Sequence, residues 1–553
     1  MALALRYVIL IRHAVCKLDW TVFRFESTIG SGGLQLREAG NIVVIGAGVG
    51  GLAAALRLAD AGCSVTVLEA HGTPGGKMRT VPSAAGPVDA GPTVLTMRPV
   101  FESLYTRVGE RLEDHLTLTP LPILARHYWD DGTCFDLSAD PAESIAHVAD
   151  VFGDGSADDY RAFAARARRL YDAFEGPMML NEAPTRAALT AKVMLRPRLI
   201  ADMAPHRTMA GLLKTAFRDP RLAQLFGRYA TYVGGSPYAS PAILSLISDA
   251  EARGVWSVAG GMHALAASLA GLAAHRGARF QYDTPVRRIV TQDGVVTGVD
   301  TDAGFIAADQ VVFNGDPRAL SVGLLGEGVQ GAVRTDAVEP RSLSACVYAF
   351  AAAPRGVDLA HHTVFFGHDP AAEFDALARG DIPEDATLYL CAQDHGCAPD
   401  ALQRFEIILN APPVPRPEAE EQTRCQTQIF RRFADFGLTF TPTPDADALT
   451  TPMGFDRLFP ASQGSLYGRS PHGMMAAFKR PTARTPIKGL YLCGGGTHPG
   501  AGVPMATLSG KHAAGAILSD RTLISTSPQT AMRGGMSTGS ATVAPKPSRS
   551  SAS

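Results

Sequence analysis

The sequence of 553 residues predicts an α/β fold around a buried parallel sheet. Three observations support this class. A strand–turn–helix–strand pattern with a glycine-rich turn lies within residues 41–100, a second strand–loop–helix pattern lies at 489–516, and helical and strand-like stretches alternate between them. Hydrophobic residues make up 46% of the chain and charged residues 19%, which excludes a mainly disordered protein and provides material for a large core.

The chain divides into seven stretches. Residues 1–40 show no clear period and predict a poorly ordered N-terminal extension. The stretches 41–100, 255–317 and 481–521 carry the strands and glycine turns of a cofactor-binding domain in three parts. Between them, 101–254 is dominated by helical patterning broken by prolines, and 318–480 combines strand-like runs with Pro-rich connections. The tail, 522–553, is rich in Ser, Thr, Pro and Gly and predicts disorder.

The first strand and the turn after it carry the strongest chemical signal. Residues 42–45 are a continuous apolar run, typical of a buried parallel strand. The pattern Gly-x-Gly-x-x-Gly follows with Gly46, Gly48 and Gly51. The first glycine permits a tight turn, the second lets the backbone approach a pyrophosphate, and the third lets a helix, expected over 51–61, pack on the strand. The N-terminus of that helix would face the phosphates.

An acidic residue follows the second strand. The strand predicted over 64–68 ends in Glu69, where a carboxylate is placed to accept hydrogen bonds from a ribose hydroxyl. Its negative charge disfavours a 2′-phosphate, so NADP is not expected. Because strand, helix, strand and acid are in register, the pattern indicates a dinucleotide site rather than a glycine-rich turn without a ligand.

The segment after Glu69 separates flavin from nicotinamide binding. Residues 74–79, Pro-Gly-Gly-Lys-Met-Arg, resemble the flavoproteins with two dinucleotide-binding domains, in which this segment wraps the FAD pyrophosphate. The resemblance implies FAD contacts from Gly76, Lys77 and Arg79, the last because guanidinium donors match phosphate oxygens. A surface arginine in a turn is the alternative for Arg79. The segment 88–93 continues with an Asp-x-Gly motif that these proteins place near the flavin.

The distal half supplies the matching pieces. Gly260 and Gly261 open an Ala/Leu-rich helix that extends to His275, and strands are expected over 279–282 and 286–290. The resemblance implies that the backbone at Val286 meets the adenine and that 311–316 returns beneath the cofactor. The strand 489–494 leads into a loop and a helix from about Met505. The N-terminus of that helix is placed to stabilise negative charge on a reduced isoalloxazine, through Gly495, Gly502 and Val503.

Over residues 41–516 the pattern resembles the carotenoid desaturases of the phytoene desaturase type, a branch of the FAD oxidoreductases. The phrase Gly-Thr-His-Pro-Gly at 496–500 is its most specific part, and the segments 84–96 and 498–510 carry a narrower likeness to the 1-hydroxycarotenoid 3,4-desaturases. The resemblance implies a Rossmann-like FAD-binding domain, a mixed-sheet substrate domain and a helical, membrane-facing subdomain. It also implies a role in carotenoid biosynthesis, by insertion of the C-3,4 double bond into acyclic 1-hydroxy- or 1-methoxy-carotenoids.

Other functions stay open at this point. They are a phytoene desaturase acting on the unhydroxylated polyene, a flavin amine oxidase, and a non-catalytic FAD-dependent carrier. Desaturation removes a hydride and a proton, and only the flavin can accept the hydride. Oxygen or a membrane quinone is expected to reoxidise it, since no second nicotinamide-type fingerprint is present. His498 is the candidate base for the proton, and a role in shaping its loop is the alternative.

The charge distribution and the cysteine pattern limit the possible binding partners. The segment from Arg186 to Arg228 contains nine basic and two acidic residues among apolar neighbours. This composition suits the surface of an anionic membrane, and a solvated helical face is the alternative. The eight cysteines form no Cys-x-x-Cys pair, so no metal site is expected, and the net charge of −2 disfavours nucleic acid. No apolar stretch is typical of a membrane span. The expected location is the cytoplasm, with peripheral attachment to the inner, photosynthetic membrane.

Overall fold

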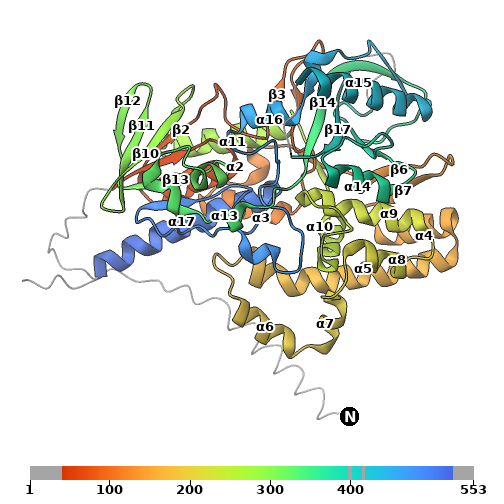
Figure 1. Ribbon diagram of the computed structural model, residues 1–553, viewed down its shortest axis with the longest axis horizontal. Helices are drawn as coiled ribbons and strands as arrows, with labels where there is room; N and C mark the ends of the chain where they lie inside the picture. Colours follow the sequence, from red (N-terminus) through yellow and green to blue (C-terminus); the bar gives the residue numbers. More distant parts are fainter. Residues whose placement is uncertain (1–39, 397–401, 414–417, 527–553) are drawn as a thin grey trace, which may run out of the picture. The chain divides into compact units, whose positions relative to one another are not determined.

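The computed structural model describes residues 40–396, 402–413 and 418–526. The predicted N-terminal extension, apart from Gly40, therefore lies outside the described residues, as does the tail from residue 527. One sheet has five strands in the order β20-β13-β1-β2-β9, with every neighbouring pair parallel; β2 and β13 are labelled in Figure 1. The strands are β1 (Asn41–Ile45), β2 (Ser64–Leu68), β9 (Arg279–Gln281), β13 (Gln310–Phe313) and β20 (Leu490–Leu492). They come from three separate stretches of the chain, the same three that carry the glycine turns.

Three helices pack beside this sheet. They are α2 (Val49–Asp60), α11 (Met262–His275) and α17 (Val503–Thr526), and α2 contacts both of the others. Small residues allow the close approach of α2 and α17, because a Cβ atom on Gly510 would overlap the carbonyl oxygen of Gly50 and lie 3.0 Å from Cβ of Ala53. The helix predicted at 51–61 begins two residues earlier, since Gly48 is its N-cap. Helix α17 extends to Thr526, so the boundary expected after residue 521 falls inside it.

A second, larger sheet is mixed. Its main path is β18-β14-β17-β16-β15-β6-β7, with β19 paired to β14; β15 and β6 are parallel and the other pairs are antiparallel. The strands are β6 (Ile123–Tyr128), β7 (Cys134–Ser138), β14 (Ser344–Arg355), β15 (His362–Phe365), β16 (Leu388–Ala392), β17 (Gln403–Ala411), β18 (Thr439–Thr441) and β19 (Leu449–Thr450). Helix α15 (Glu418–Asp435) packs Ile429 and Phe433 on it. The stretch 101–254 is thus not only helical, because it contributes β6 and the edge strand β7.

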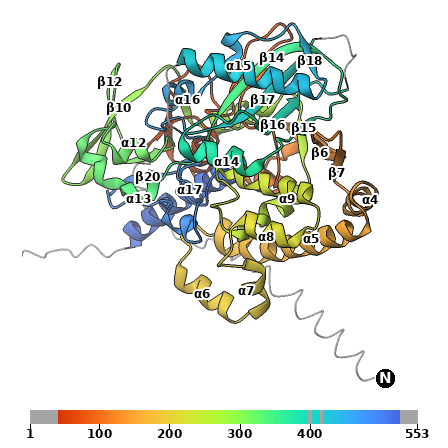
Figure 2. The ribbon, with the colours of Figure 1, turned by 45° about the vertical axis from the view of Figure 1, so that its right-hand side comes forward.

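Apart from β5 (Leu118–Pro120), the regular elements in the rest of 101–254 are helical. Its helices are α3 (Arg98–Arg107), α4 (Pro141–Phe152), α5 (Asp154–Phe174), α6 (Arg186–Met194), α7 (Pro197–Met203), α8 (Met209–Ala216), α9 (Pro220–Gly227) and α10 (Ile247–Ala252). Three prolines that interrupt the helical pattern, Pro141, Pro197 and Pro220, begin α4, α7 and α9, where the missing N–H costs nothing. Figures 1 and 2 both show α6 and α7 together below α5, on the side away from the mixed sheet.

Short elements complete the fold. They are the sheet of β10 (Val286–Gln292), β11 (Val295–Thr301) and β12 (Gly304–Ala307), the pairs β3 (Thr80–Val81) with β4 (Val88–Asp89) and β5 (Leu118–Pro120) with β8 (Trp256–Val258), and the helices α12 (Arg318–Ser321), α13 (Thr335–Val338), α14 (Pro370–Arg379) and α16 (Pro452–Leu458). Within the described residues, none of the helices has the length and apolar character needed to cross a membrane.

Candidate cofactor and substrate site

The glycine loop stands at the carboxyl end of β1. Gly46 has a φ of 96°, and its N–H donates to the carbonyl oxygen of Leu68 at 2.8 Å. A Cβ atom on Gly51 would overlap the carbonyl oxygen of Gly46, so the third glycine is a steric requirement of the turn. Gly48 caps α2 without any side-chain hydrogen bond, which leaves the first amides of the helix to be satisfied by something else. An anion at this helix N-terminus would satisfy them.

Glu69 orders that loop. Its carboxylate is 5% exposed and accepts hydrogen bonds from the backbone N–H of Ala47 at 2.6 Å and of His71 at 3.0 Å. The carbonyl oxygen of Glu69 accepts from the N–H of Thr284 at 2.8 Å, which brings the start of β10, with Val286, to the same place. A carboxylate has lone pairs for further donors, so ribose hydroxyls remain compatible with these bonds.

Asn314, at the end of β13, is a functional position that sequence reasoning passed over. Its amide Nδ2 donates to the carbonyl oxygens of Gly46 and Gly48, at 3.1 and 3.3 Å. Its Oδ1 accepts from Sγ of Cys493 at 3.4 Å, at the end of β20. One side chain therefore joins the glycine loop to the C-terminal loop. The available signal was a polar residue directly after an apolar strand of a parallel sheet, at the edge where ligands bind.

The C-terminal loop, 494–502, surrounds open space. A Cβ atom on Gly495 or Gly502 would meet nothing closer than 3.9 Å, and one on Gly500 would meet nothing within 4 Å. Arg480 ties the loop to a neighbouring segment, because it donates to the carbonyl oxygens of Gly495 and Tyr467 at 2.9 and 2.8 Å. Helix α17 starts at the end of this loop, with Val503 as its first residue. Room beside a helix N-terminus fits a planar group that becomes negatively charged on reduction.

The Gly-Gly segment reaches the first loop through its glycines. The N–H of Gly75 donates to the carbonyl oxygen of Ala47 at 2.9 Å, and a Cβ atom on Gly76 would lie 3.1 Å from Cα of Gly48. Lys77 is directed elsewhere: its amine donates to the carbonyl oxygen of Leu466 at 2.6 Å. Burial lowers the pKa of Lys77 to about 8.

Arg79 is not the surface arginine of the alternative interpretation. Its Nη2 donates to Oγ1 of Thr450 at 2.6 Å, and its guanidinium lies 5.8 Å from the ring centre of Phe455. Burial lowers its pKa, which the neighbouring Glu406 partly offsets. These partners all belong to the mixed-sheet part of the chain, so a phosphate contact by Arg79 stays a prediction.

The Asp-x-Gly segment has a structural task. The carboxylate of Asp89 accepts from the backbone N–H of Met262 at 2.5 Å and of His263 at 3.3 Å, which caps α11. The backbone of Asp89 exchanges two hydrogen bonds, of 3.1 and 3.0 Å, with the side-chain amide of Gln393 beyond β16. Burial raises the pKa of Asp89. The segment thus joins the cofactor-binding part of the chain to the mixed sheet.

His498, the candidate base, is 4% exposed and points away from the cofactor loops. Its Nε2 lies 2.9 Å from the carbonyl oxygen of Asn181, to which it donates, and its ring stacks on His512 at 5.8 Å. Burial lowers its pKa. Asn181 follows the irregular turn after α5, so His498 ties the C-terminal loop to the helical region. The assignment as base stays a prediction.

A mainly apolar cavity of about 700 Å³ lies between the mixed sheet and the helical region and extends to the start of α17. Its walls are formed by residues 92–94, by α8 and α9, by Val364, Phe366, Tyr389 and Ile408 of the mixed sheet, and by Gly502, Val503 and Pro504. Two predicted cofactor residues, Gly502 and Val503, therefore belong also to the cavity wall. An elongated hydrocarbon could contact a flavin at this place.

Polar side chains are buried beside the cavity. Tyr389 Oη forms hydrogen bonds with His362 Nδ1 at 2.7 Å and Thr93 Oγ1 at 2.6 Å. The fully buried Glu406 has its pKa raised well above the usual value by burial and by Asp89. Ligand atoms of His361, His362 and Cys391 lie within 4.8 Å of one another, a grouping that sequence spacing did not reveal. We assign no ion to it, because burial raises the pKa of Cys391 and disfavours the thiolate that binds a metal; of the His362 nitrogens, Nδ1 is bonded to Tyr389, and Nε2 has no hydrogen-bond partner among the described residues.

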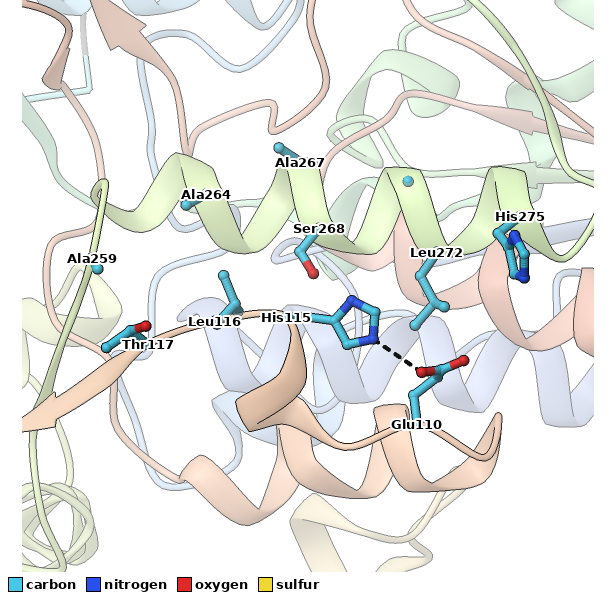
Figure 3. A pocket seen from close by; sticks show the side chains of 11 residues that line it. Glu110, His115, Leu116, Thr117, Ala259, Ala264, Ala267, Ser268, Leu272 and His275 are labelled. Atoms are coloured by element: carbon cyan, nitrogen blue, oxygen red, sulfur yellow. Dashed lines mark hydrogen bonds and ion pairs between the residues drawn. The ribbon is translucent and has the colours of Figure 1, made fainter.

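An open groove runs along the outer side of α11 (Figure 3). Three of its polar side chains have partners: His115 pairs with Glu110 at 3.2 Å, and Ser268 shares a hydrogen bond of 2.6 Å with Tyr105. The groove is lined by none of the predicted site residues. It is separate from the cofactor loops and the cavity.

Comparison with known proteins shows which proteins this chain resembles. The chain matches the family described as flavin-containing amine oxidoreductase over residues 49–402 and 439–518. It is 54% identical over 482 residues to a hydroxyneurosporene desaturase of Cereibacter sphaeroides, covering 87% of this chain and 97% of that protein. It is 50% identical over 489 residues to a hydroxyneurosporene desaturase of Rhodobacter capsulatus, covering 88% of this chain and 99% of that protein.

Solved structures agree on the fold. Cyclohexylamine oxidase from Brevibacterium oxydans aligns with a TM-score of 0.53 and 17% identity, over 88% of this chain and 100% of that chain. This likeness shows the fold alone, that of a flavin amine oxidase with mixed sheets and helices. The predicted fold class is confirmed to that extent.

We expect Gly48→Val to abolish binding of the dinucleotide. A Cβ atom at this position would already lie 3.0 Å from Nδ2 of Asn314, and the remaining methyl groups would occupy the space that the pyrophosphate needs. Flavin content of the purified protein, from its absorption, measures the effect. Gly271→Val on α11, where a Cβ atom meets nothing within 4 Å, is the matched control. Stoichiometric flavin in the Gly48 variant would contradict the assignment.

We expect His498→Ala to reduce stability more than turnover. The variant loses a buried hydrogen bond worth about 1–3 kcal/mol, which thermal unfolding would detect. Its kcat, measured with flavin content held equal, should fall by less than about tenfold. A general base would instead contribute about 10²–10⁴-fold, so a loss of that size in a flavin-loaded, stable variant would establish His498 as the base.

Proposed function

The chain belongs to the flavin-containing amine oxidoreductases and, within them, to the carotenoid desaturases, and we propose that it inserts the C-3,4 double bond into acyclic 1-hydroxy- or 1-methoxy-carotenoids. The observation that carries this is the 54% identity across 97% of a hydroxyneurosporene desaturase. The cavity supports it, because its wall is mainly apolar and includes the start of α17. FAD is the cofactor.

The FAD site draws on the residues at the carboxyl edge of the parallel sheet. Gly46, Gly48 and Gly51, with the first amides of α2, are proposed to hold the pyrophosphate. Glu69 accepts from the ribose, and Val286 lies where the adenine is expected. Gly76 would complete the pyrophosphate side, whereas contacts of Lys77 and Arg79 with FAD stay predictions, because their side chains are bonded to Leu466 and Thr450. Gly495, Gly502 and Val503 contact the isoalloxazine at the start of α17.

When bound, FAD supplies the hydride acceptor that no side chain provides. The protein holds the polyene in a dry cavity with the C-3,4 bond beside residues 502–504, so that one orientation is productive. Loss of the proton from an extended polyene cation needs no strong base, which agrees with the absence of His498 from the residues that line the cavity. An electron acceptor, which we propose to be oxygen or a membrane quinone, would be needed to reoxidise FAD.

We further propose that the hairpin of α6 and α7 rests on the membrane surface. Leu195 is 84% exposed and Met194 is 65% exposed, and the cations Arg196 and Arg198 flank them. Within the described part of the chain, neither arginine has an ion-pair partner. Three other cations of the basic segment are engaged: Arg218 with Asp159, Arg221 with Asp219 and Arg228 with Glu251. The hairpin therefore combines cations without an ion-pair partner with the two most exposed large apolar side chains among the described residues, as an interfacial surface requires.

Reversing three charges should release the protein from anionic vesicles. Each cation near such a surface contributes about 1 kcal/mol, so replacing Arg196, Arg198 and Arg207 by Glu should give a large change in vesicle flotation. The control variant replaces Arg111, Arg279 and Lys488, exposed cations outside the hairpin, and changes the net charge equally. Equal flotation of both variants and the wild type would show that the hairpin is only a solvated face.

Substrate choice tests the assignment directly. Offered in membranes, 1-hydroxyneurosporene should be converted, with its absorption maximum moving to longer wavelength because conjugation is extended. Neurosporene and phytoene should be poor substrates, by up to about 10⁴-fold, since a site that hydrogen-bonds an oxygen rejects an analogue without it. Primary amines should not be oxidised. Conversion of phytoene without action on the hydroxylated carotenoid would restore the phytoene desaturase alternative.

A further inference from the structure

One carboxyl group faces the cavity. Among the described residues that line it, Glu373 of α14 is the only acidic one, and it is 2% exposed. It lies in the first turn of α14, after the N-cap Asp369, where an acidic residue suits the helix dipole. That explains an acid on this turn but not its burial, because the dipole could be matched from the solvent side. Burying a carboxyl group in an apolar wall costs free energy unless it has partners.

The partners of Glu373 are incomplete. Its Oε2 accepts from Oγ1 of Thr387 at 2.8 Å, while Oε1 has no hydrogen-bond partner among the described residues. Asn410, which also lines the cavity, lies close enough to favour the ionised form. Burial raises the pKa of Glu373 to about 7, against the opposing effect of Thr387, so neutral and ionised forms coexist near neutral pH.

Several other polar groups on the cavity wall are already engaged. Tyr389 is bonded to His362 and Thr93, and Gln224 bridges the indole N–H of Trp129 at 2.9 Å and the carbonyl oxygen of Gly367 at 2.7 Å. Arg228 holds Tyr232 at 2.5 Å and Glu251 at 3.3 Å. Glu373 differs because one of its oxygens is left over. A ligand oxygen in the cavity would complete its hydrogen bonding.

We propose that Glu373, steadied by Thr387, recognises the oxygen at C-1 of the carotenoid substrate. The inference rests on the proposed function, which requires a carotenoid with an oxygenated end. A neutral carboxyl group donates to a hydroxyl or methoxy oxygen, and an ionised one accepts from a hydroxyl. Only C-2 separates C-1 from the bond to be oxidised, so the recognising group must share a cavity with the start of α17. Glu373 and residues 502–504 do share one.

The experiment compares two substrates in membranes, 1-hydroxyneurosporene and neurosporene, and follows the ratio of their kcat/KM values. Glu373→Leu should lower turnover of the hydroxylated substrate by about 10- to 100-fold and leave neurosporene little changed, so that the ratio falls by the same factor. Glu373→Gln keeps the volume and one donor but cannot ionise, and should lower the ratio by about tenfold. Asp375→Leu, at an exposed position of the same helix, is the control and should leave the ratio unchanged.

Each outcome decides the proposal. An unchanged ratio in both Glu373 variants, with wild-type conversion of 1-hydroxyneurosporene intact, overturns the role of Glu373 and leaves the proposed function standing. An equal loss on both substrates also overturns it, because a base or a purely structural residue would act on either. A wild type that does not convert 1-hydroxyneurosporene overturns the proposed function and this inference together. If Glu373→Leu does not retain FAD, the ratio in Glu373→Gln decides.

Discussion

The close approach of backbone at the edge of the parallel sheet is the constraint on which the rest of the structure depends. The Gly46 turn leaves no room for a side chain on Gly51, and the same holds where α17 crosses α2 at Gly510. Asn314 then bonds both carbonyl oxygens of the turn and reaches the end of β20 through Cys493. Residues from three distant stretches are fixed against one another within one hydrogen-bonded cluster. Because this cluster fixes the position of α17, it also fixes where the N-terminus of α17 meets the cavity.

Local features of this arrangement were predictable. The glycine turn, the strand at 64–68 and Glu69 are all specified within 30 residues, because each needs a particular residue type at a particular distance from β1. Contacts between distant segments were not. Nothing in the sequence pairs Asp89 with the first amides of α11, and the polar end of β13 offers no periodic signal that singles out Asn314. Strands β6 and β7 were missed as well; β6 enters the mixed sheet only by pairing with β15, which follows more than 200 residues later, and β7 joins it through β6.

For a related reason, the charge pattern alone described the basic segment between Arg186 and Arg228 incompletely. A count of cations between Arg186 and Arg228 treats all nine alike, whereas in the fold some are paired or buried and others are not. Arg228 is buried against Glu251 and two tyrosine rings, and Arg221 stacks over Phe152 at 4.9 Å while pairing with Asp219. These cations stabilise packing and are unavailable to a lipid surface. Arg196 and Arg198 are distinguished by their position on a short hairpin with little apolar surface to cover, and this position is a tertiary property.

Selectivity in such a cavity has to come from few atoms. An apolar wall stabilises any polyene by about 25 cal/mol for each Å² that it removes from water, and acyclic carotenoids offer nearly the same apolar area. The wall therefore provides affinity without discrimination. A buried polar group discriminates strongly. It forms its hydrogen bond with the correct substrate but stays unpaired with a substrate that lacks the oxygen, and only that complex loses the free energy. Burial raises the pKa of Glu373 and Glu406 and lowers that of Lys77, so it favours the neutral form of these three groups. A cavity with this character binds hydrocarbon along its length and leaves the choice between substrates to polar groups on its wall, of which Glu373 has a carboxyl oxygen without a partner among the described residues.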